Sequence, residues 1–249
     1  ELGVQLFTRK GKRIKLNACG ALLLKRLPSI LGSIDNVKLE LSEVSNNPSQ
    51  HICLNILSCS SLIPALLKSF KLKYPTTSFS LVQNIQALEY DICISSVPST
   101  ETGKQDTVLM DEEIMLVVPH TYNAALHGPI SLGDLDEADF ISLNKGTAFR
   151  SITDYYCERA GITPNIIFEC DNPSTVRGLI GAGLGIAFWP RISWGPLYDD
   201  YVKALHIKDI DCRRTVLMRT PEGKKISGTA QLFLNFTKKY FYDLMSKEG

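Results

Sequence analysis

Apolar residues follow two alternating patterns after residue 50. Short apolar runs of strand length, such as Ile52 to Ile56 and Ser78 to Gln83, flank a segment of helical spacing, Leu62 to Tyr74, with Pro64 in its first turn. The runs that continue this order are Asp91 to Ser96, Ile114 to Pro119, Phe140 to Leu143, Ser151 to Ala160 and Ile166 to Cys170. Strand, helix, strand order predicts an α/β fold with largely parallel sheets.

The clearest single unit is the stretch DNPSTVRGLIGAGLGIAFWP at residues 171–190. Asn172 is a good helix N-cap, and Pro173 suits the first helical position because its missing N–H would be unpaired there anyway. The apolar face of this helix consists of Val176, Leu179 and Ile180. Gly183 can take the left-handed conformation that ends a helix, and a buried strand follows at 186–189. The unit is either ordinary α/β packing or an anion site at the helix start.

Composition narrows the class of protein. Lys and Arg number 27 against 26 Asp and Glu, so any affinity for nucleic acid must come from local clusters. Seven cysteines without a CxxC pair indicate reduced thiols in a cytosol. No apolar stretch reaches about 18 residues, so we expect a soluble, cytoplasmic protein without a membrane partner. The sequence opens at Glu1 without a methionine, which indicates that natural N-terminal residues precede it.

The first segment carries the most local charge. Five cations fall within seven residues around Gly11, namely Arg9, Lys10, Lys12, Arg13 and Lys15. Two short β runs joined by a basic turn form either a wing that contacts phosphate or a solvated basic hairpin.

The amino-acid sequence of this segment favours the first alternative, a wing that contacts phosphate. LGVQLFTRKGKRIKLNACG resembles the end of the winged helix-turn-helix of LysR-type transcriptional regulators, whose pattern is approximately LGxxLFxRxxRxxxLTxAG. The matching residues are Leu2, Gly3, Leu6, Phe7, Arg9, Leu16, Ala18 and Gly20. Asn17 stands where Thr is usual, and Asn caps a helix equally well. The resemblance implies that residues 1–17 end the winged helix-turn-helix. It also implies that double-stranded DNA contacts Arg9, Lys10, Lys12 and Arg13.

A heptad-like seam follows at residues 18–47. Its apolar positions are Leu23, Leu27, Ile30, Ile34, Val37, Leu41 and Val44. This spacing predicts a helix that pairs with another helix, or alternatively an amphipathic helix packed on its own domain. The resemblance implies that it is the linker helix of a homodimer or homotetramer. Pro28 predicts a kink near residues 24–28, and the polar run 46–49 predicts a hinge.

The remaining chain, residues 48–249, resembles the LysR-type effector domain over nearly its whole length. The matching blocks are LLKSFKLKYPTTSFSL, YDICIS, EEIMLVVP, ISLGDLDEADFISL and VRGLIGAGLGIAFWP. The resemblance implies the two-lobed fold of type 2 periplasmic binding proteins. Lobe I would hold residues 48–113 and 208–249, including a strand at 213–218 and a terminal helix at 228–247. Lobe II would hold residues 114–207.

One connection is shorter than this fold requires. Only residues 84–90 separate two strands that should run parallel, whereas a parallel crossover normally needs about ten residues or more. The family usually has a short helix there. We therefore expect that natural residues are missing from the sequence between Gln83 and Asp91, and a continuous chain there would instead require an altered first lobe.

The chemistry of the chain indicates binding and not catalysis. The four histidines have no partners at metal-ligand spacing, and no GxSxG, HExxH or phosphate-loop motif occurs, so we expect no enzyme, metal or cofactor. Peroxide-sensing relatives use a cysteine pair in the segment that matches Lys145 to Cys157. Here Ala148 replaces the peroxide-reactive cysteine, so we expect no disulfide switch of that type.

Strand ends and helix starts between the lobes form the candidate effector site, since open α/β sheets bind ligands there. Its candidate residues are Ser58, Ser60, Ser61, Ser95, Ser96, Thr147, Phe149, Asn172 and Phe188. Each hydroxyl could instead be a helix cap. The predicted function is a DNA-binding regulator that senses a small, anionic metabolite, and the alternative is a stand-alone solute-binding protein.

Overall fold

The computed structural model describes residues 3–10, 13–24, 27, 50–83, 89–103, 106–122, 128–135, 137–197, 201–223 and 226–248. Its strands are β1 (Phe7–Lys10), β2 (Arg13–Leu16), β3 (His51–Ile56), β4 (Ser78–Val82), β5 (Ile92–Pro98), β6 (Thr107–Pro119), β7 (Asp139–Leu143), β8 (Asn165–Cys170), β9 (Ala187–Pro190), β10 (Val202–Leu205) and β11 (Arg213–Arg219). Its α-helices are α2 (Ile63–Lys73), α3 (Ala148–Ala160), α4 (Pro173–Gly181) and α5 (Gly228–Glu248). Two 3-10 turns, η1 and η2, span Ser99–Glu101 and Leu132–Leu135.

The N-terminal segment forms the predicted hairpin. Strands β1 and β2 pair antiparallel, with Lys10 opposite Arg13. Asn17 then starts a helical segment at residues 18–24, because its Oδ1 accepts the Gly20 N–H at 2.9 Å. Gly20 has to be glycine, since a Cβ there would lie 2.1 Å from the Leu6 carbonyl oxygen. The basic hairpin and the Asn17 cap are therefore confirmed.

Most of the predicted linker helix lies outside the described residues. The same holds for residues 46–49, the predicted hinge, and for residues 84–88 in the short connection between β4 and β5. The dimerising seam and the missing residues of that connection stay predictions. None of the helices in the described part of the chain combines the length and the apolar character that crossing a membrane would need.

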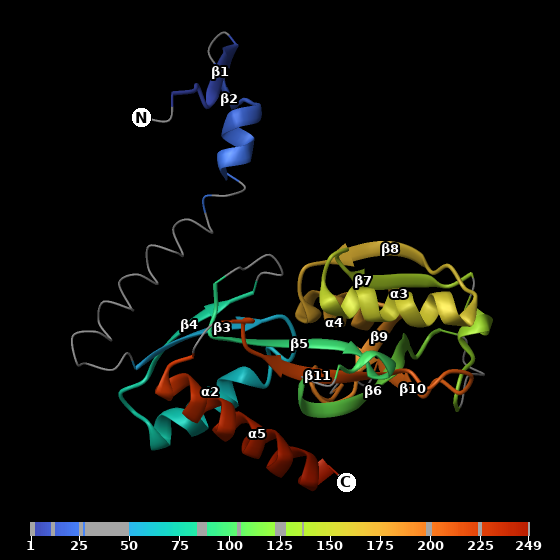
Figure 1. The fold of residues 1–249 in the computed structure, drawn as a ribbon. Helices are drawn as coiled ribbons and strands as arrows, with labels where there is room; N and C mark the ends of the chain where they lie inside the picture. Colours follow the sequence, from blue (N-terminus) through green and yellow to red (C-terminus); the bar gives the residue numbers. More distant parts are fainter. Residues whose placement is uncertain are drawn as a thin grey trace.

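The large sheet joins two lobes through one long strand. Its strand order is β10, β6, β11, β5, β3 and β4, and β9 also pairs with β6. The first half of β6 pairs with β11, while its second half pairs with β9 and β10. A separate pair of strands, β7 and β8, lies above α3 in Figure 1. Strand β6 therefore carries the chain from one lobe to the other, and β11 brings it back.

The expectation of largely parallel sheets is wrong. Among the described strands beyond residue 50, three pairings are parallel and four are antiparallel. The antiparallel pairings all involve β6 or β11. A strand that returns the chain alongside an outgoing strand runs antiparallel to it, and the period of apolar residues does not report this direction.

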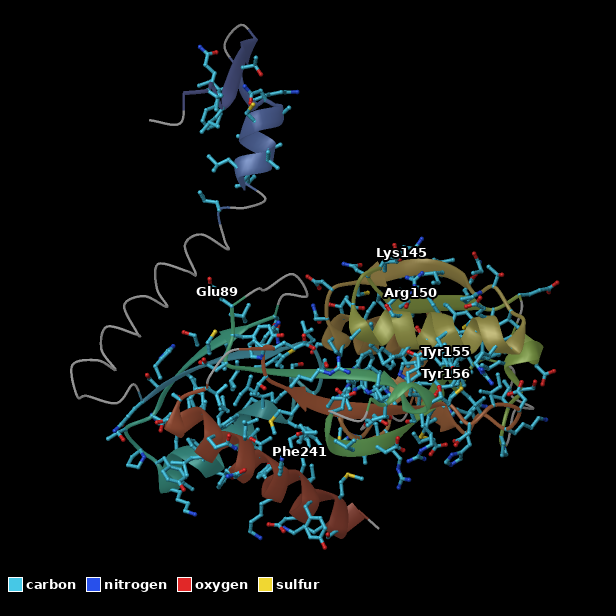
Figure 2. The ribbon with its side chains drawn as sticks, in the orientation of Figure 1. Glu89, Lys145, Arg150, Tyr155, Tyr156 and Phe241 are labelled. Carbon is cyan, nitrogen blue, oxygen red and sulfur yellow. The ribbon has the colours of Figure 1, made fainter. Side chains whose placement is uncertain are left out.

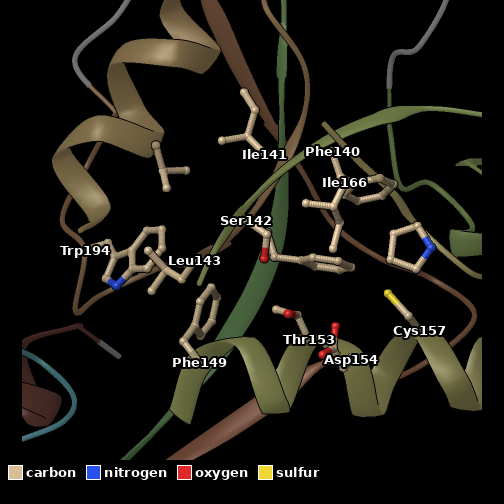
Figure 3. A pocket seen from close by; sticks show the side chains of 13 residues that line it. Phe140, Ile141, Ser142, Leu143, Phe149, Thr153, Asp154, Cys157, Ile166 and Trp194 are labelled. Atoms are coloured by element: carbon tan, nitrogen blue, oxygen red, sulfur yellow. The ribbon is translucent and has the colours of Figure 1, made fainter. Parts of the chain in front are cut away.

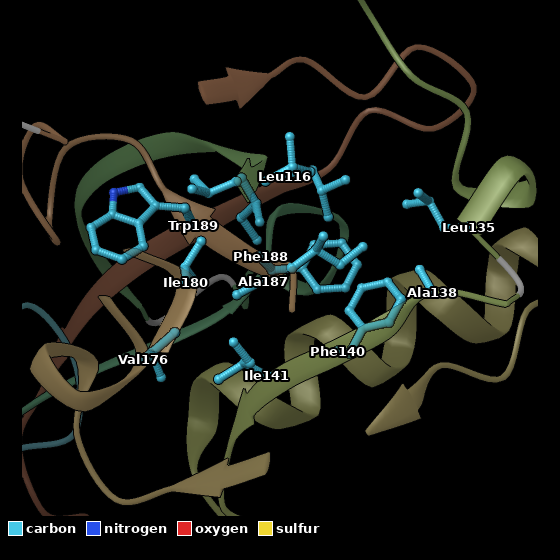
Figure 4. Packing of buried hydrophobic residues seen from close by; sticks show 14 of the residues in the cluster. Leu116, Leu135, Ala138, Phe140, Ile141, Val176, Ile180, Ala187, Phe188 and Trp189 are labelled. Carbon is cyan, nitrogen blue, oxygen red and sulfur yellow. The ribbon is translucent and has the colours of Figure 1, made fainter. Parts of the chain in front are cut away.

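Each lobe has its own hydrophobic core. In lobe I, Phe70 on α2 contacts the rings of Phe79, Phe233 and Phe236, with centroids 5.0 to 5.9 Å apart, so α2 and α5 pack over the same face. In lobe II, the core gathers around Phe140 and the strands β6, β7 and β9 (Figure 4). Figure 1 shows the two lobes side by side with β6 and β11 between them.

The unit at residues 171–190 folds as predicted. Helix α4 starts at Pro173 after Asn172, whose Oδ1 accepts the Thr175 N–H at 2.9 Å. Val176 and Ile180 are buried in the lobe II core, and Gly183 has a φ of 77°. Strand β9 follows, with all four residues buried. Caps, glycine and apolar spacing act within a few residues of each other, which is why local sequence predicted this unit.

Candidate functional site

A cleft of about 510 Å³ lies between the lobes, where strands end and helices begin. Its walls are the segments that lead into α2, α3 and α4, together with Gln83 after β4, Arg214 of β11 and Trp194 in the loop after β9. The lining residues are Ile56, Leu57, Ser58, Cys59, Ser60, Gln83, Leu143, Lys145, Gly146, Thr147, Ala148, Phe149, Asp171, Asn172, Pro173, Trp194 and Arg214. Helix N-termini expose unpaired N–H groups and partial positive charge, so this arrangement favours an anion.

The start of α3, here termed the anion seat, is the best-formed candidate site for an anion. Thr147 caps the helix, because its Oγ1 accepts the Arg150 N–H at 3.3 Å and donates to the Asn144 carbonyl at 3.0 Å. Gly146, with a φ of 88°, turns the chain into this cap. Among the described residues, no acceptor contacts the N–H groups of Ala148 and Phe149. Both residues line the cleft, so these donors are available to a ligand.

The start of α4 is differently charged. The Asn172 side chain accepts from Thr175 and donates from Nδ2 to Asp171 Oδ1 at 2.7 Å. Asp171 therefore places a carboxylate directly before the helix, where it offsets the positive end of the helix dipole. The α3 start, with Lys145 beside it, keeps its positive character.

Lobe I contributes a strained turn between β3 and α2. Cys59 has a φ of 61°, the left-handed region that side chains other than glycine rarely adopt. This turn brings Ser58 and Ser60 to the cleft. Burial raises the pKa of the Cys59 thiol to about 12, which keeps it protonated and unreactive at neutral pH.

A buried ion pair closes the floor of the cleft. Arg214 Nε donates to Glu112 Oε1 at 2.8 Å, and the two side chains are 1% and 0% exposed. Glu112 also accepts the N–H groups of Ile192 at 2.9 Å and Ser193 at 2.8 Å, and the Ser193 hydroxyl at 2.7 Å. This carboxylate has four donors, so the pair is a fixed part of the wall.

Aromatic rings form the lobe II side. The Arg214 guanidinium lies 5.0 Å from the Phe149 ring, and the Phe149 and Trp194 centroids are 4.8 Å apart. Behind them lies an apolar pocket of about 10 Å³, shown in Figure 3, which has room for no more than a water molecule. A ligand would therefore pack against Phe149 and Trp194 without entering the core.

The sequence belongs to a family with this architecture. The model of the LysR substrate binding domain matches residues 45–241. The chain belongs to the LysR family of transcriptional regulators. The uncharacterized HTH-type regulator YybE of Bacillus subtilis (strain 168) is 29% identical over 250 residues, which cover 96% of this chain and 85% of YybE. A match of that extent reaches beyond the effector domain, which favours a LysR regulator over a stand-alone solute-binding protein.

Solved LysR structures confirm the two-lobed fold. The effector binding domain of QuiR in complex with shikimate has a TM-score of 0.65 and 22% identity, over 78% of this chain and 97% of that domain. Full-length CbnR complexed with its target DNA has a TM-score of 0.66 and 16% identity, over 91% of this chain and 82% of CbnR. At these identities the likeness shows the fold alone.

The cleft of this LysR regulator brings together five of the nine predicted effector residues. They are Ser58, Ser60, Thr147, Phe149 and Asn172. The other four do not line the cleft. Ser61 donates its hydroxyl to the Ser193 carbonyl, and Ser95 and Ser96 are buried in β5. Phe188 is buried and stacks on Phe140 at 5.7 Å, because every residue of β9 faces the core. An effector role for any of these nine residues stays a prediction.

Twelve of the 17 residues that line the cleft were not in the predicted set, and four of these are charged or carry an indole ring. Lys145 and Asp171 lie one or two residues before the predicted effector residues Thr147 and Asn172, so adjacency could have identified them. Trp194 and Arg214 come from distant parts of the chain, and no local signal brings them to the cleft.

The predicted DNA contacts lie at the edge of the described part of the chain. Arg9, Lys10 and Arg13 belong to the hairpin strands, but their side chains are outside the described residues, as is all of Lys12. Their contact with DNA stays a prediction.

Cys157, His51 and His206 lie outside the cleft, and each is buried or hydrogen-bonded. The seven cysteines all lie in the described part of the chain and form no disulfide with one another, and burial raises the pKa of Cys157 to about 12. His51 bonds the hydroxyls of Ser78 and Ser80 at 2.8 and 3.0 Å. His206 contacts Glu113. The described residues contain no group of histidines, cysteines and carboxylates arranged for a metal ion.

Proposed function

We propose that this regulator senses a small carboxylate, or a similar anion, in the cleft between its lobes. The observation that carries the proposal is the start of α3, where Lys145, Ala148 and Phe149 line the same cavity and the N–H groups of Ala148 and Phe149 have no acceptor among the described residues. Nearby, Thr147 and Asn172 are occupied as caps, so they position these donors more than they bind the ligand themselves. The shikimate bound by QuiR, itself a carboxylate, supports an acidic effector.

The anion would act on DNA binding through the strands that join the lobes. Helix α3 begins at the cleft and carries Tyr155 and Tyr156, labelled in Figure 2, near its other end. The Tyr156 hydroxyl donates to the Arg213 carbonyl at 2.5 Å, and the hydroxyls of Tyr155 and Thr100 lie 2.8 Å apart. A ligand that pulls on α3 therefore changes the contacts of the crossing strands, and with them the angle between the lobes.

The proposed response to the anion is a change in DNA binding. The wing would contact phosphates, and the linker helix would pair two chains in a homodimer, or four in a homotetramer. The DNA-bound structure of CbnR supports this interpretation. Such a regulator works beside the chromosome, so we propose a cytoplasmic location, and its cleft chemistry requires no catalytic step.

Ala148→Pro tests the anion seat directly. Proline is favoured at the first helical position and removes the N–H, and the extended ψ of 146° at Thr147 suits a following proline. One hydrogen bond to a charged group contributes about 1.5 to 3 kcal/mol, so affinity should fall about 10-fold to 100-fold. Ala148→Val adds bulk but keeps the N–H, and it serves as the matched control.

The measurement has two stages. Thermal shift with small carboxylates, starting from shikimate, finds a ligand, because a ligand that binds only the folded state raises its stability. Calorimetry then compares that ligand on the wild type and the two variants. Equal affinities for Ala148→Pro and Ala148→Val would exclude the α3 start as the anion seat.

A further inference from the structure

The cleft wall carries two opposite charges on neighbouring turns. Lys145 follows β7 and Asp171 follows β8, and these strands pair in parallel with Leu143 opposite Cys170. The Asn144 N–H donates to the Cys170 carbonyl at 2.8 Å, so the two strand ends stay in register beyond the sheet. Neighbouring strands are about 4.8 Å apart, which sets the scale of the separation between the two turns.

Lys145 and Asp171 do not form an ion pair with each other among the described contacts. Both residues line the cleft. Asp171 Oδ1 accepts from Asn172, while no donor among the described residues contacts Oδ2. The side chain is thus held in place with one carboxylate oxygen left for another partner.

A cleft for a plain anion gains nothing from this carboxylate. Asp171 repels an anion held at the start of α3, and it also offsets the dipole of α4. The same carboxylate attracts an ammonium group, which needs an acceptor-only partner. Together the two neighbouring turns place a binding site for an anion and a binding site for a cation in the same cleft.

We propose that the effector is zwitterionic, an amino acid or a closely related amino carboxylate, and this rests on the anion site proposed above. Its carboxylate binds the Ala148 and Phe149 N–H groups beside Lys145, and its ammonium group binds Asp171. Both sites lie on neighbouring turns of one cleft, which fits a ligand that carries an amine and a carboxylate. The side chain then extends along Phe149 and Trp194, toward the polar residues of lobe I.

The sign of one substitution separates this proposal from a plain anion site. Asp171→Asn removes the attraction for an ammonium group, so the affinity for an amino acid should fall about 10-fold or more. For a carboxylate without an amine, the same change removes a repulsion, so binding should tighten. Glu158→Gln is the matched control, because it removes one exposed negative charge from α3 away from the cleft.

The experiment uses the full chain and pairs of probes. Each of the common L-amino acids is compared with the same acid lacking its amino group, first by thermal shift at millimolar concentration and then by calorimetry. The proposal expects an amino acid to bind at least about 10-fold more tightly than its deaminated partner. It also expects this preference to disappear in Asp171→Asn and to persist in Glu158→Gln.

Two results would overturn the zwitterion and leave the anion site standing. One is a best ligand without an amine that binds Asp171→Asn more tightly and Ala148→Pro more weakly. The other is an amino acid whose affinity is the same in Asp171→Asn as in the wild type but falls in Ala148→Pro. If Ala148→Pro and Lys145→Gln both leave the affinity of a true ligand unchanged, the proposed site itself is wrong.

Discussion

The buried ion pair between Arg214 and Glu112 predicts a large change in the free energy of unfolding when its cation is removed. Arg214→Met keeps a long side chain but removes the cation from Glu112, which stays buried with three donors from Ile192 and Ser193. An uncompensated buried charge costs about 3 to 5 kcal/mol. We expect a loss of that size in the free energy of unfolding, because neither side chain of the pair reaches solvent.

The neighbouring arginine provides a matched control. Arg213 pairs with Asp111, but both side chains are more than one third exposed, and successive residues of a strand face opposite sides. Solvent screens such a pair, so Arg213→Met should cost about 1 kcal/mol or less. The two variants remove the same cation from adjacent positions and differ in burial.

Urea unfolding followed by tryptophan fluorescence measures both losses, since Trp189 and Trp194 lie in lobe II close to the pair. With an m-value of about 2 to 3 kcal/mol/M, Arg214→Met should lower the midpoint by about 1 to 2 M. The double variant Glu112→Gln with Arg214→Met should recover part of the loss, because neutral partners leave no buried charge.

The proposed effect of burial is wrong if Arg214→Met lowers the free energy of unfolding by no more than Arg213→Met does. It also fails if the double variant is no more stable than Arg214→Met alone, since the cost would then come from packing and not from the charge left on Glu112.

Two further predictions concern the wing and the thiols. Replacing Arg9 and Arg13 by Ala in the full-length regulator should weaken binding to specific and random DNA alike. It should also reduce the slope of log K against log salt by about 0.9 for each phosphate that the protein no longer neutralises, and an unchanged slope in gel-shift titrations would exclude the wing as a phosphate-binding element. Burial raises the pKa of Cys157 and Cys212 from 9.0 to about 12, so the stability they contribute is complete below pH 9 and is lost between pH 9 and 12. The urea midpoint of the wild type should fall as the pH rises from about 8 to about 11, and that of Cys157→Ala should fall less steeply. Equal slopes of midpoint against pH in the two proteins would show that this thiol ionises in the folded state.

Part of the candidate site was readable from local sequence. The cap at Asn172 was predicted because a cap bonds an N–H three residues ahead, and that bond occurs. Thr147 was predicted as an effector residue with a cap as the alternative, and it caps α3. Ser58 and Ser60 were predicted from their place after a strand. The same rule also selected Ser95 and Ser96, which lie inside β5 and are buried, since position after an apolar run does not specify where a strand stops.

By itself, the sequence determined the elements whose signals lie within one turn of helix or one hairpin. These include the basic hairpin, the Asn17 cap and the unit from Asn172 to Gly183. It also determined the family, because the matching blocks run through the whole chain. Tertiary structure decided which strands run antiparallel, and it brought Arg214 to Glu112, which is 102 residues away in the chain. Ion pairs and cleft walls are made by segments that meet only when the chain folds, so no local pattern of apolar and polar residues encodes them.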